Sequence, residues 1–495
     1  MTEMPAPEGG PGVRPEAVPC QESHDVDVPA GLRDFMAQGW APPLAVVVEQ
    51  APWAPYAAKR RAALAARFPT EALVIPSGTL KVRANDTDYR FRPGSDFFWL
   101  TGEPGEDAVL VIRPADDGAS AGDAPATLYV HPRSDRSTAA FFTDRRYGEL
   151  WVGPRRGLDE VAAVSGLETA PLAELPAALA QLGRTRVLRG YDAGVDAGVD
   201  AGVDATRDAD DELAVVLSEL RLIKDDHEIA QLSAAIAATV LGFEDVIREL
   251  PRAIRTSERW IEGTFDRRAR LAGNDVGYGS ICACGPHATT LHWVHNDGVV
   301  RPGELMLLDM GVESRELYTA DVTRTLPING RWTEPQRRVY DVVHRAQRAA
   351  VEAVRPGVDF LEPHRVAMRV IAATLEEWGI LPVSAEESLQ KDSRLHQRYT
   401  LHGTSHMLGL DVHDCASARS ETYRDGTLAP GMVLTVEPGL YFQPDDLTVP
   451  AELRGIGVRI EDDVLVTDTG RRNLSEALPR DPDEVERWMA ALLPG

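Results

Sequence analysis

The sequence predicts a two-domain α+β protein, and three observations support this fold class. The chain has 495 residues, and domains typically hold about 100–200 residues. Hydrophobic residues make up 43% and charged residues 26% of the chain, which is close to the average of globular proteins. Runs typical of strands and of helices both occur, but in the second half they do not alternate regularly. This irregular order favours α+β over a doubly wound sheet.

The chain begins with a segment that carries no hydrophobic periodicity. Residues 1–30 are rich in proline, glycine and acidic residues, so we expect residues 1–44 to form a disordered or extended N-terminal tail. The first helix is predicted just after Trp53, where the run AAKRRAALAARF is rich in alanine with basic residues interspersed.

Residues 45–218 are predicted to form the first domain, of the α/β type. Short β-branched or aromatic runs bounded by turn residues predict strands at 72–76, 96–102, 108–113 and 126–132. A helix is predicted over 171–182. The Asp-Ala-Gly-Val repeat of residues 192–205 is expected to be a surface loop. A calcium-binding array is disfavoured there, because alanine and valine supply no ligands.

Residues 219–495 are predicted to form the second domain. Its entry lies in a long helical segment over 211–250, in which we expect helix breaks. Further along the chain, strands and helices mix. Strands are predicted near 278–284, 305–312, 320–326, 432–437 and 456–466, and helices near 334–354, 362–378 and 482–493.

Composition narrows the functional classes. Lys and Arg total 52 against 77 Asp and Glu, a formal net charge of −25, which argues against nucleic-acid and anionic-membrane partners. No run approaches about 18 uninterrupted apolar residues, and the N-terminus lacks the features of a secretory signal. We therefore expect a cytoplasmic protein. Cys20, Cys282, Cys284 and Cys415 form no disulfide framework, and Cys282 and Cys284 are interpreted as core thiols.

Carboxylates embedded in strand-like apolar runs are the most informative feature of the second domain. Asp309 interrupts one such run and Glu437 ends another. Period-two alternation places Asp321 on one face of its strand, and makes Arg459 and Glu461 project together from theirs. Each carboxylate alone could be solvated or salt-bridged. Because an unpaired carboxylate in a buried strand is costly, four in the same context favour a metal site.

Three histidines lie close together in a stretch that contains glycines, namely His402, His406 and His413. His402 and His406 have helical spacing, but no Glu follows His402, so the HExxH metalloprotease pattern is absent. Two Asp, two Glu and one His form a ligand set too rich in oxygen for a closed structural zinc site. Such a set suits a pair of ions like Mn²⁺ or Co²⁺, which can share and activate a water. The residues alone thus favour a dinuclear metal hydrolase.

Several motifs of the chain resemble those of a known family, the Xaa-Pro aminopeptidases (aminopeptidase P) of the pita-bread metallopeptidase superfamily. The resemblance covers about residues 45–485 and rests on LLDMGVESRELYTADVTRTLPING, LHGTSHMLGLDVHD, VLTVEPGLYF, GIGVRIEDDVLVT and NDTDYRFRPGSDFFWLTG. It implies a creatinase-like α/β domain before a C-terminal pita-bread (creatinase/aminopeptidase) catalytic domain. Two departures are visible. The Asp-Ala-Gly-Val repeat is foreign to the family, and the stretch between Asp309 and Asp321 is one residue longer than usual, an insertion expected in a hairpin turn.

The resemblance also implies a complete site. Matched metal ligands, which would hold two divalent ions, are Asp309, Asp321, His406, Glu437 and Glu461, with Asp321 and Glu461 bridging. The ions would be Mn²⁺ first, with Co²⁺ or Zn²⁺ as alternatives. Matched catalytic positions are Glu437, His292, His413 and Arg459. Matched substrate-binding positions are Tyr278, His402 and Tyr441. From the residues alone, Tyr278 could instead be a core aromatic, and Arg459 only the partner of a ligand.

The implied reaction releases the N-terminal residue from peptides with proline at the second position. A metal-bridging hydroxide would attack the first carbonyl, and Glu437 would carry the water's proton to the prolyl nitrogen. Two alternatives stay open: a prolidase, which cleaves only Xaa-Pro dipeptides, and a non-catalytic pita-bread binding module, which would be expected to lose ligands. Because members of this family are commonly oligomeric, the resemblance implies a homo-oligomer, either a dimer or a tetramer.

Overall fold

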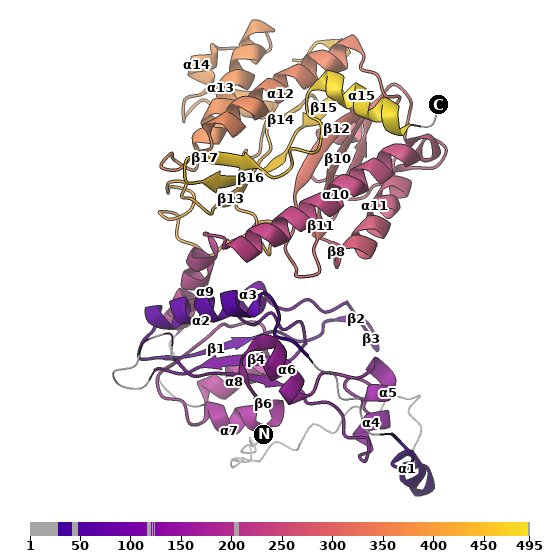
Figure 1. Ribbon diagram of the computed structural model, residues 1–495. Helices are drawn as coiled ribbons and strands as arrows, with labels where there is room; N and C mark the ends of the chain where they lie inside the picture. Colours follow the sequence, from indigo (N-terminus) through magenta and orange to yellow (C-terminus); the bar gives the residue numbers. More distant parts are fainter. Residues whose placement is uncertain are drawn as a thin grey trace, which may run out of the picture.

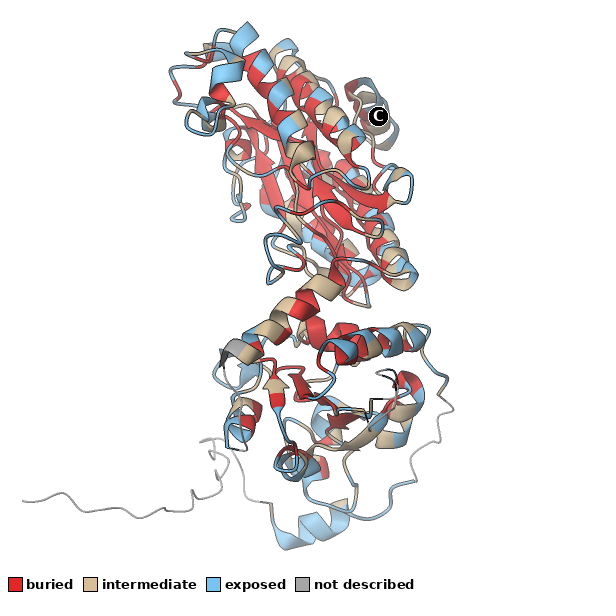
Figure 2. Cartoon of the chain, turned by 90° about the vertical axis from the view of Figure 1, so that its left-hand side faces the viewer, coloured by how far each residue is buried: buried red, intermediate tan, exposed pale blue. Residues whose placement is uncertain are grey.

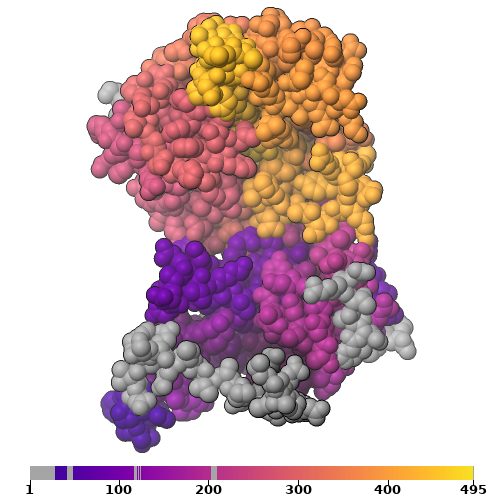
Figure 3. All heavy atoms as spheres, turned by 180° about the vertical axis from the view of Figure 1, so that it is seen from behind, coloured from indigo at the N-terminus to yellow at the C-terminus, as the bar shows by residue number. Residues whose placement is uncertain are grey.

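The computed structural model of the protein describes residues 28–41, 48–115, 120, 122, 124–201 and 207–493. These residues form two lobes, which are joined by the helices α9 (Arg207–Arg221) and α10 (Asp226–Ala253) (Figure 1). In the space-filling view from behind, the indigo-to-magenta N-terminal lobe lies directly against the C-terminal lobe (Figure 3).

A mixed sheet forms the centre of the N-terminal lobe. Its described strand order is β6-β5-β4-β1-β7, in which β1 pairs antiparallel with β4 and parallel with β7. The bounds are β1 Ala72–Pro76, β4 Val109–Ile112, β5 Ala126–Val130, β6 Glu168–Pro171 and β7 Thr185–Val187. Strand alternation sends Leu73 and Ile75 into one apolar cluster and Val74 into the cluster on the opposite face. The sheet is therefore covered on both sides.

Helices and short strands surround this sheet. Their bounds are α1 Ala30–Met36, α2 Ala54–Arg67, β2 Val82–Ala84, β3 Thr87–Asp88, α3 Ser95–Thr101, α4 Ala140–Thr143, α5 Glu149–Val152, α6 Leu158–Ser165, α7 Leu175–Leu179 and α8 Ala193–Asp200. The predicted helix after Trp53 and the predicted strands at 72–76, 108–113 and 126–132 are confirmed.

The strand predicted at 96–102 is wrong, because these residues form α3. Every residue of α3 is buried, and Gly102 takes a left-handed φ of 61° that ends the helix. The aromatic residues Phe97, Phe98 and Trp99 suggested a strand, but such preferences depend on packing. Here all three join a cluster that extends into the C-terminal lobe.

The loop predicted for the repeat at 192–205 is also wrong where the structure describes it, since residues 193–200 form α8. The Asp192 carboxylate accepts hydrogen bonds from the backbone of Gly194 and Val195, which caps the helix. A four-residue repeat places its valines one helical turn apart, on a single face. Val195 and Val199 accordingly pack into the core beneath the sheet. Residues 202–205 lie outside the described residues.

The N-terminal tail predicted over residues 1–44 is described only from 28 to 41. This part is not uniformly extended, because it contains α1, none of whose residues is buried. The rest of the predicted tail, with Cys20, lies outside the described residues.

The expected break in the 211–250 helical segment lies between α9 and α10. Asp225 begins α10 with a capping box, in which its carboxylate and that of Glu228 each accept a backbone hydrogen bond. By length and mean hydropathy α10 could cross a membrane. Its apolar face, however, packs beside α11 in the core of the C-terminal lobe, and core helices commonly meet the same criteria.

The C-terminal lobe is built on antiparallel strands in the described orders β12-β10-β9, β13-β16-β17, β14-β15 and β11-β8. Figure 2 shows these strands buried between helices whose outer faces are exposed. The strands are β8 Asp275–Val276, β9 Ile281–Cys284, β10 Leu305–Met310, β11 Val312–Glu313, β12 Val322–Pro327, β13 Val433–Val436, β14 Gly439–Tyr441, β15 Gly457–Arg459, β16 Asp462–Thr467 and β17 Gly470–Asn473. The remaining helices are α11 Glu258–Ala272, α12 Glu334–Ala353, α13 Glu362–Glu377, α14 Ala385–Ser388 and α15 Pro482–Leu492.

Every strand and helix predicted for the second half of the chain is present near its predicted position. Cys282 and Cys284 on β9 are free and buried, as the interpretation of core thiols requires.

Candidate active site

The four predicted carboxylates meet because the strands that carry them end at one place. On β10, Asp309 stands opposite Thr323 of β12. Asp321 directly precedes β12, Glu437 directly follows β13, and Glu461 lies between β15 and β16. The extra residue between Asp309 and Asp321 falls outside this pairing. The chain turns near Leu317, which takes a left-handed φ of 65°, and the β10–β12 register is continuous.

His406 joins this cluster from the loop before β13. Its Nε2 lies 3.4 Å from Asp321 Oδ2 and 3.5 Å from Glu437 Oε1. Its Nδ1 lies 3.1 Å from the backbone oxygen of Met407, which makes Nδ1 the donor and leaves Nε2 as a free acceptor. One ligand atom each from Asp321, His406 and Glu461 lies within 4.8 Å of the others.

The charge balance of the cluster fits divalent cations. Burial raises the pKa of Asp321 well above its usual range, and the charges of Asp309 and Asp463 add to this. Burial likewise raises the pKa of Glu461, with contributions from Asp321 and Glu437. Acidic side chains held so close repel one another when ionised. Hard cations bound between them would remove this repulsion, and carboxylate oxygens with one imidazole are a suitable donor set.

Tyr278 lies among the carboxylates rather than in the apolar core. Its hydroxyl oxygen is 2.7 Å from Asp309 Oδ1 and 2.6 Å from Asp321 Oδ1. A phenol has one proton, so it can donate fully to only one of the two. Burial and both carboxylates raise the pKa of Tyr278 well above its usual range. The interpretation of Tyr278 as a core aromatic is therefore excluded.

Arg459 is the cation that faces the carboxylates. Its Nη2 donates to Asp309 Oδ2 at 2.6 Å, its Nη1 to the Tyr441 hydroxyl at 3.0 Å, and its Nε to Thr323 Oγ1 at 3.1 Å. Arg459 is thus the partner of a predicted ligand, and it also lines the cavity described below.

His402 connects the cluster to a tyrosine behind it. Its Nδ1 lies 3.3 Å from Glu437 Oε2, and its Nε2 lies 2.7 Å from the hydroxyl of Tyr441. Burial raises the pKa of Glu437, but the hydrogen bond and charge of His402 outweigh it and lower this pKa to about 2. Tyr441 is buried and is absent from the described wall of the cavity. Its hydroxyl forms hydrogen bonds with His402 and Arg459 and so helps to orient both side chains.

These side chains line a cavity of about 680 Å³. Its wall carries all five predicted metal ligands together with Tyr278, His292, His402, His413 and Arg459. The ring of His413 packs edge-on against that of His406, with 4.5 Å between the ring centroids. His292 is exposed.

The apolar part of this wall is not predicted from the sequence, and it is formed by Ile281, Leu291, Val294 and Val412. The signal was weak but present, because Leu291 and Val294 flank His292 and Val412 precedes His413. The hydroxyl of Ser405 also lies at this wall and is buried without a hydrogen-bond partner within the described chain.

Comparison with known proteins agrees with this arrangement. Residues 230–468 match the model of metallopeptidase family M24, and residues 57–188 match that of the aminopeptidase P N-terminal domain. The chain is 56% identical over 462 residues to Xaa-Pro aminopeptidase 1 of Streptomyces coelicolor, covering 93% of this chain and 92% of that protein.

Solved structures show the same similarity over most of the chain. Proline aminopeptidase P II from Yersinia pestis has a TM-score of 0.77 at 32% identity, over 88% of this chain and 99% of that one. A zinc-substituted Escherichia coli aminopeptidase P in complex with product has a TM-score of 0.78 at 31% identity, over 89% of this chain and 98% of that one. The two lobes, the converging carboxylates and these similarities together place the chain in the Xaa-Pro aminopeptidases of metallopeptidase family M24, with an aminopeptidase P N-terminal domain before a pita-bread catalytic domain.

Proposed function

We propose that this protein is a metal-dependent aminopeptidase that removes the N-terminal residue from peptides with proline at the second position. The observation that carries the proposal is one cavity that gathers Asp309, Asp321, His406, Glu437 and Glu461, in a chain 56% identical to a Xaa-Pro aminopeptidase.

Two divalent ions would occupy the cluster, held by these five side chains, with Asp321 and Glu461 between them. Mn²⁺ suits the hard oxygen donors, and Co²⁺ or Zn²⁺ are alternatives. The zinc-substituted E. coli relative supports the view that such sites accept more than one metal. When bound, such ions lower the pKa of a shared water and offset negative charge on the substrate's carbonyl oxygen.

The chain's own residues would then handle the proton and the substrate. Glu437 lines the cavity, where its carboxylate would take a proton from water and pass it to the prolyl nitrogen. His292 and His413 stand on the same wall and can donate hydrogen bonds to the substrate or to the oxyanion that forms from its carbonyl.

The preference for proline would follow from the character of the wall. Proline lacks an amide hydrogen and has a fixed φ, so its ring needs an apolar surface rather than a hydrogen-bond acceptor. Ile281, Leu291 and Val294 supply apolar surface in the cavity. A free amine at the substrate's N-terminus would be attracted by the acidic cluster, which accounts for exopeptidase action.

We also propose that the protein forms a homo-oligomer, either a dimer or a tetramer. It would be located in the cytoplasm and would have no nucleic-acid or membrane partners. The N-terminal lobe leaves Phe35 on α1 77% exposed and Trp151 on α5 54% exposed, and large exposed apolar side chains commonly mark protein interfaces. Sedimentation velocity of the full chain tests the assembly, and a purely monomeric chain would contradict it.

The direct test of the reaction compares Ala-Pro-Ala, Ala-Pro and Ala-Ala-Ala in the presence of Mn²⁺. We expect release of alanine from Ala-Pro-Ala and none from Ala-Ala-Ala. Cleavage of Ala-Pro alone would instead establish a prolidase. Absence of cleavage of both proline peptides would favour the non-catalytic binding module.

A further inference from the structure

We propose that Arg221, in the connection between the two lobes, is a positioning residue for the reaction: it fixes the segment Asp411–Cys415 and thereby the imidazole of His413. This inference rests on the proposed function, in which His413 contacts the substrate. On this proposal, contacts with the N-terminal lobe help to position a residue of the active site.

His413 depends on its backbone for its orientation. In the part of the chain that the structure describes, its ring packs against His406 and no hydrogen bond holds either ring nitrogen. The segment that carries it is instead fixed on both sides of the histidine, through the side chains of Asp411 and Asp414. The backbone amide of Asp414 also donates to Met407 O at 2.9 Å.

Arg221 contacts both of these carboxylates. As the last residue of α9, it directs Nη2 to Asp411 Oδ2 at 2.9 Å and, in a short contact, to Asp414 Oδ1. Its side chain is 5% exposed and that of Asp414 is 1% exposed. A planar guanidinium can bind two carboxylates at once in fixed directions, so this one side chain sets the position of both residues that flank Val412 and His413.

A second cation completes the attachment of the segment to the inter-lobe connection. Lys224 is wholly buried, and its Nζ lies 2.8 Å from Asp414 Oδ2 and 2.7 Å from the backbone oxygen of Arg221. Asp414 is thus held by two cations at once, which lower its pKa far below the usual range against the effect of burial. Removing one partner from such a buried network leaves an uncompensated charge.

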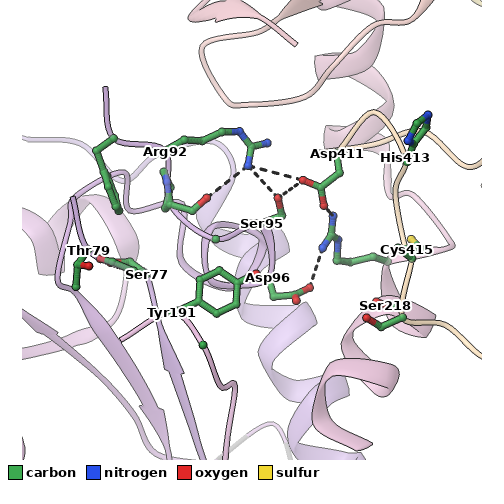
Figure 4. Close-up of a pocket in the computed structure, with 18 of the residues that line it drawn as sticks. Ser77, Thr79, Arg92, Ser95, Asp96, Tyr191, Ser218, Asp411, His413 and Cys415 are labelled. Carbon is green, nitrogen blue, oxygen red and sulfur yellow. Dashed lines mark hydrogen bonds and ion pairs between the residues drawn. The ribbon is translucent and has the colours of Figure 1, made fainter. Parts of the chain in front are cut away.

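The N-terminal lobe contributes the other contacts around a cavity of about 520 Å³ between the lobes, and Figure 4 shows those of Ser95 and Asp96. Arg221 Nη1 donates to Asp96 Oδ1 at 2.8 Å. Ser95 Oγ donates to Asp411 Oδ1 at 2.6 Å, and Arg92 Nη2 donates to the backbone oxygen of Leu410 at 2.7 Å. The same segment therefore faces the catalytic cavity on one side and the N-terminal lobe on the other, with His413 lining both cavities.

The test measures kcat and KM for Ala-Pro-Ala in Asp96→Asn and Asp411→Asn, which remove charge without changing side-chain size. Displacing a reacting group by about 1 Å can cost about a hundredfold in rate. We therefore expect kcat to fall about tenfold or more in Asp411→Asn and less in Asp96→Asn, with KM changed by less than about threefold. Bound metal should stay at the wild-type level in both.

Two further comparisons separate positioning from stability. Arg221→Lys keeps the charge and should retain more kcat than Arg221→Met. Asp225→Asn breaks the Arg60–Asp225 ion pair, with 2.8 Å between Nη2 and Oδ2, which also joins the lobes but does not touch residues 411–415. It should lower the melting temperature and leave kcat unchanged. Variants at Asp96 and Asp411 that melt earlier but keep wild-type kcat would overturn the proposal.

A readout that is independent of turnover distinguishes this inference from the proposed function. In histidine-labelled enzyme, the NMR signal of His413 is identified by its loss in His413→Gln. This signal should move in Asp411→Asn and stay in place in Asp225→Asn. If the wild type does not cleave Ala-Pro-Ala, the proposed function fails, and the NMR signal alone decides the positioning role. An unmoved His413 signal in Asp411→Asn would refute that role.

Discussion

Arg459 Nη2 lies 2.6 Å from Asp309 Oδ2, and the two side chains are only 4% and 12% exposed. Asp309 therefore differs from Asp321 and Glu461, because the guanidinium of Arg459 donates a hydrogen bond directly to its carboxylate. The contact also keeps the guanidinium directed into the catalytic cavity. The negative charge of the acidic cluster is thus balanced in part by Arg459 and in part, on our proposal, by metal ions.

Replacing Arg459 by lysine should reduce kcat/KM for Ala-Pro-Ala strongly. An ammonium group can contact Asp309, but it cannot reach Tyr441 and Thr323 at the same time, as the three guanidinium nitrogens do. We expect a loss on the order of a hundredfold, about 2.7 kcal/mol of transition-state stabilisation. Steady-state kinetics of the folded variant measures it. Wild-type kcat/KM in Arg459→Lys would show that charge alone suffices.

Tyr278→Phe should destabilise the metal-free protein more than the metal-loaded one. The phenol supplies the hydrogen bond shared by Asp309 and Asp321, and losing a buried donor to charged groups costs about 1–3 kcal/mol. Bound cations would satisfy the same oxygen atoms. Thermal unfolding in chelator and in Mn²⁺ gives the two differences. Equal destabilisation under both conditions would contradict this account of the site.

Metal removal should lower the melting temperature, and Asp321→Asn should abolish that dependence. Binding to the folded state at a hundred times the dissociation constant adds about 2.7 kcal/mol of stability. Without metal, Asp321→Asn should be more stable than the wild type, because it removes one of the mutually repelling buried carboxylates. A variant that still gains stability from Mn²⁺ as the wild type does would exclude Asp321 as a ligand.

His364 predicts a pH dependence of stability that is separate from catalysis. Burial, with the charges of His396 and His402, lowers the pKa of His364 from 6.5 to about 4. Because the unfolded chain binds this proton more readily, the stabilising contribution is complete above pH 6.5 and is lost as the pH falls toward 4.

The comparison that isolates this effect is wild type against His364→Asn, with unfolding measured at pH 7 and at pH 4. The stability of the wild type relative to the variant should fall by about 3 kcal/mol between pH 7 and pH 4. A difference that stays constant with pH would show that His364 takes up its proton equally in the folded and unfolded chains.

The second half of the fold and the acidic cluster could be predicted from the sequence, because the signals for both lie within short stretches of the chain. Asp309, Asp321, Glu437 and Glu461 stand in or beside apolar strands, where a carboxylate is conspicuous. The aromatic residues of α3 predict a strand, but they form a helix that packs into a cluster shared by both lobes. Such a tertiary context is invisible to local patterns.

The contacts made by Arg221 could not be predicted, for a related reason. Its partners Asp96, Asp411 and Asp414 are more than a hundred residues away along the chain. From the sequence alone, an arginine at the end of an amphipathic helix is predicted to be an ordinary exposed residue. The sequence predicts a role for His413 within the segment Asp411–Cys415, but it does not predict the contacts between this segment and the N-terminal lobe.

The release of free alanine from Ala-Pro-Ala tests the central claim most directly. It should be measured with Mn²⁺, with excess chelator, and with Asp321→Asn in Mn²⁺ as the matched control. The account predicts alanine and Pro-Ala as products in Mn²⁺ alone, with no release in chelator or by the variant. Alanine release that persists in chelator, or in Asp321→Asn at the wild-type rate, would contradict the assignment of this carboxylate cluster as the catalytic metal site.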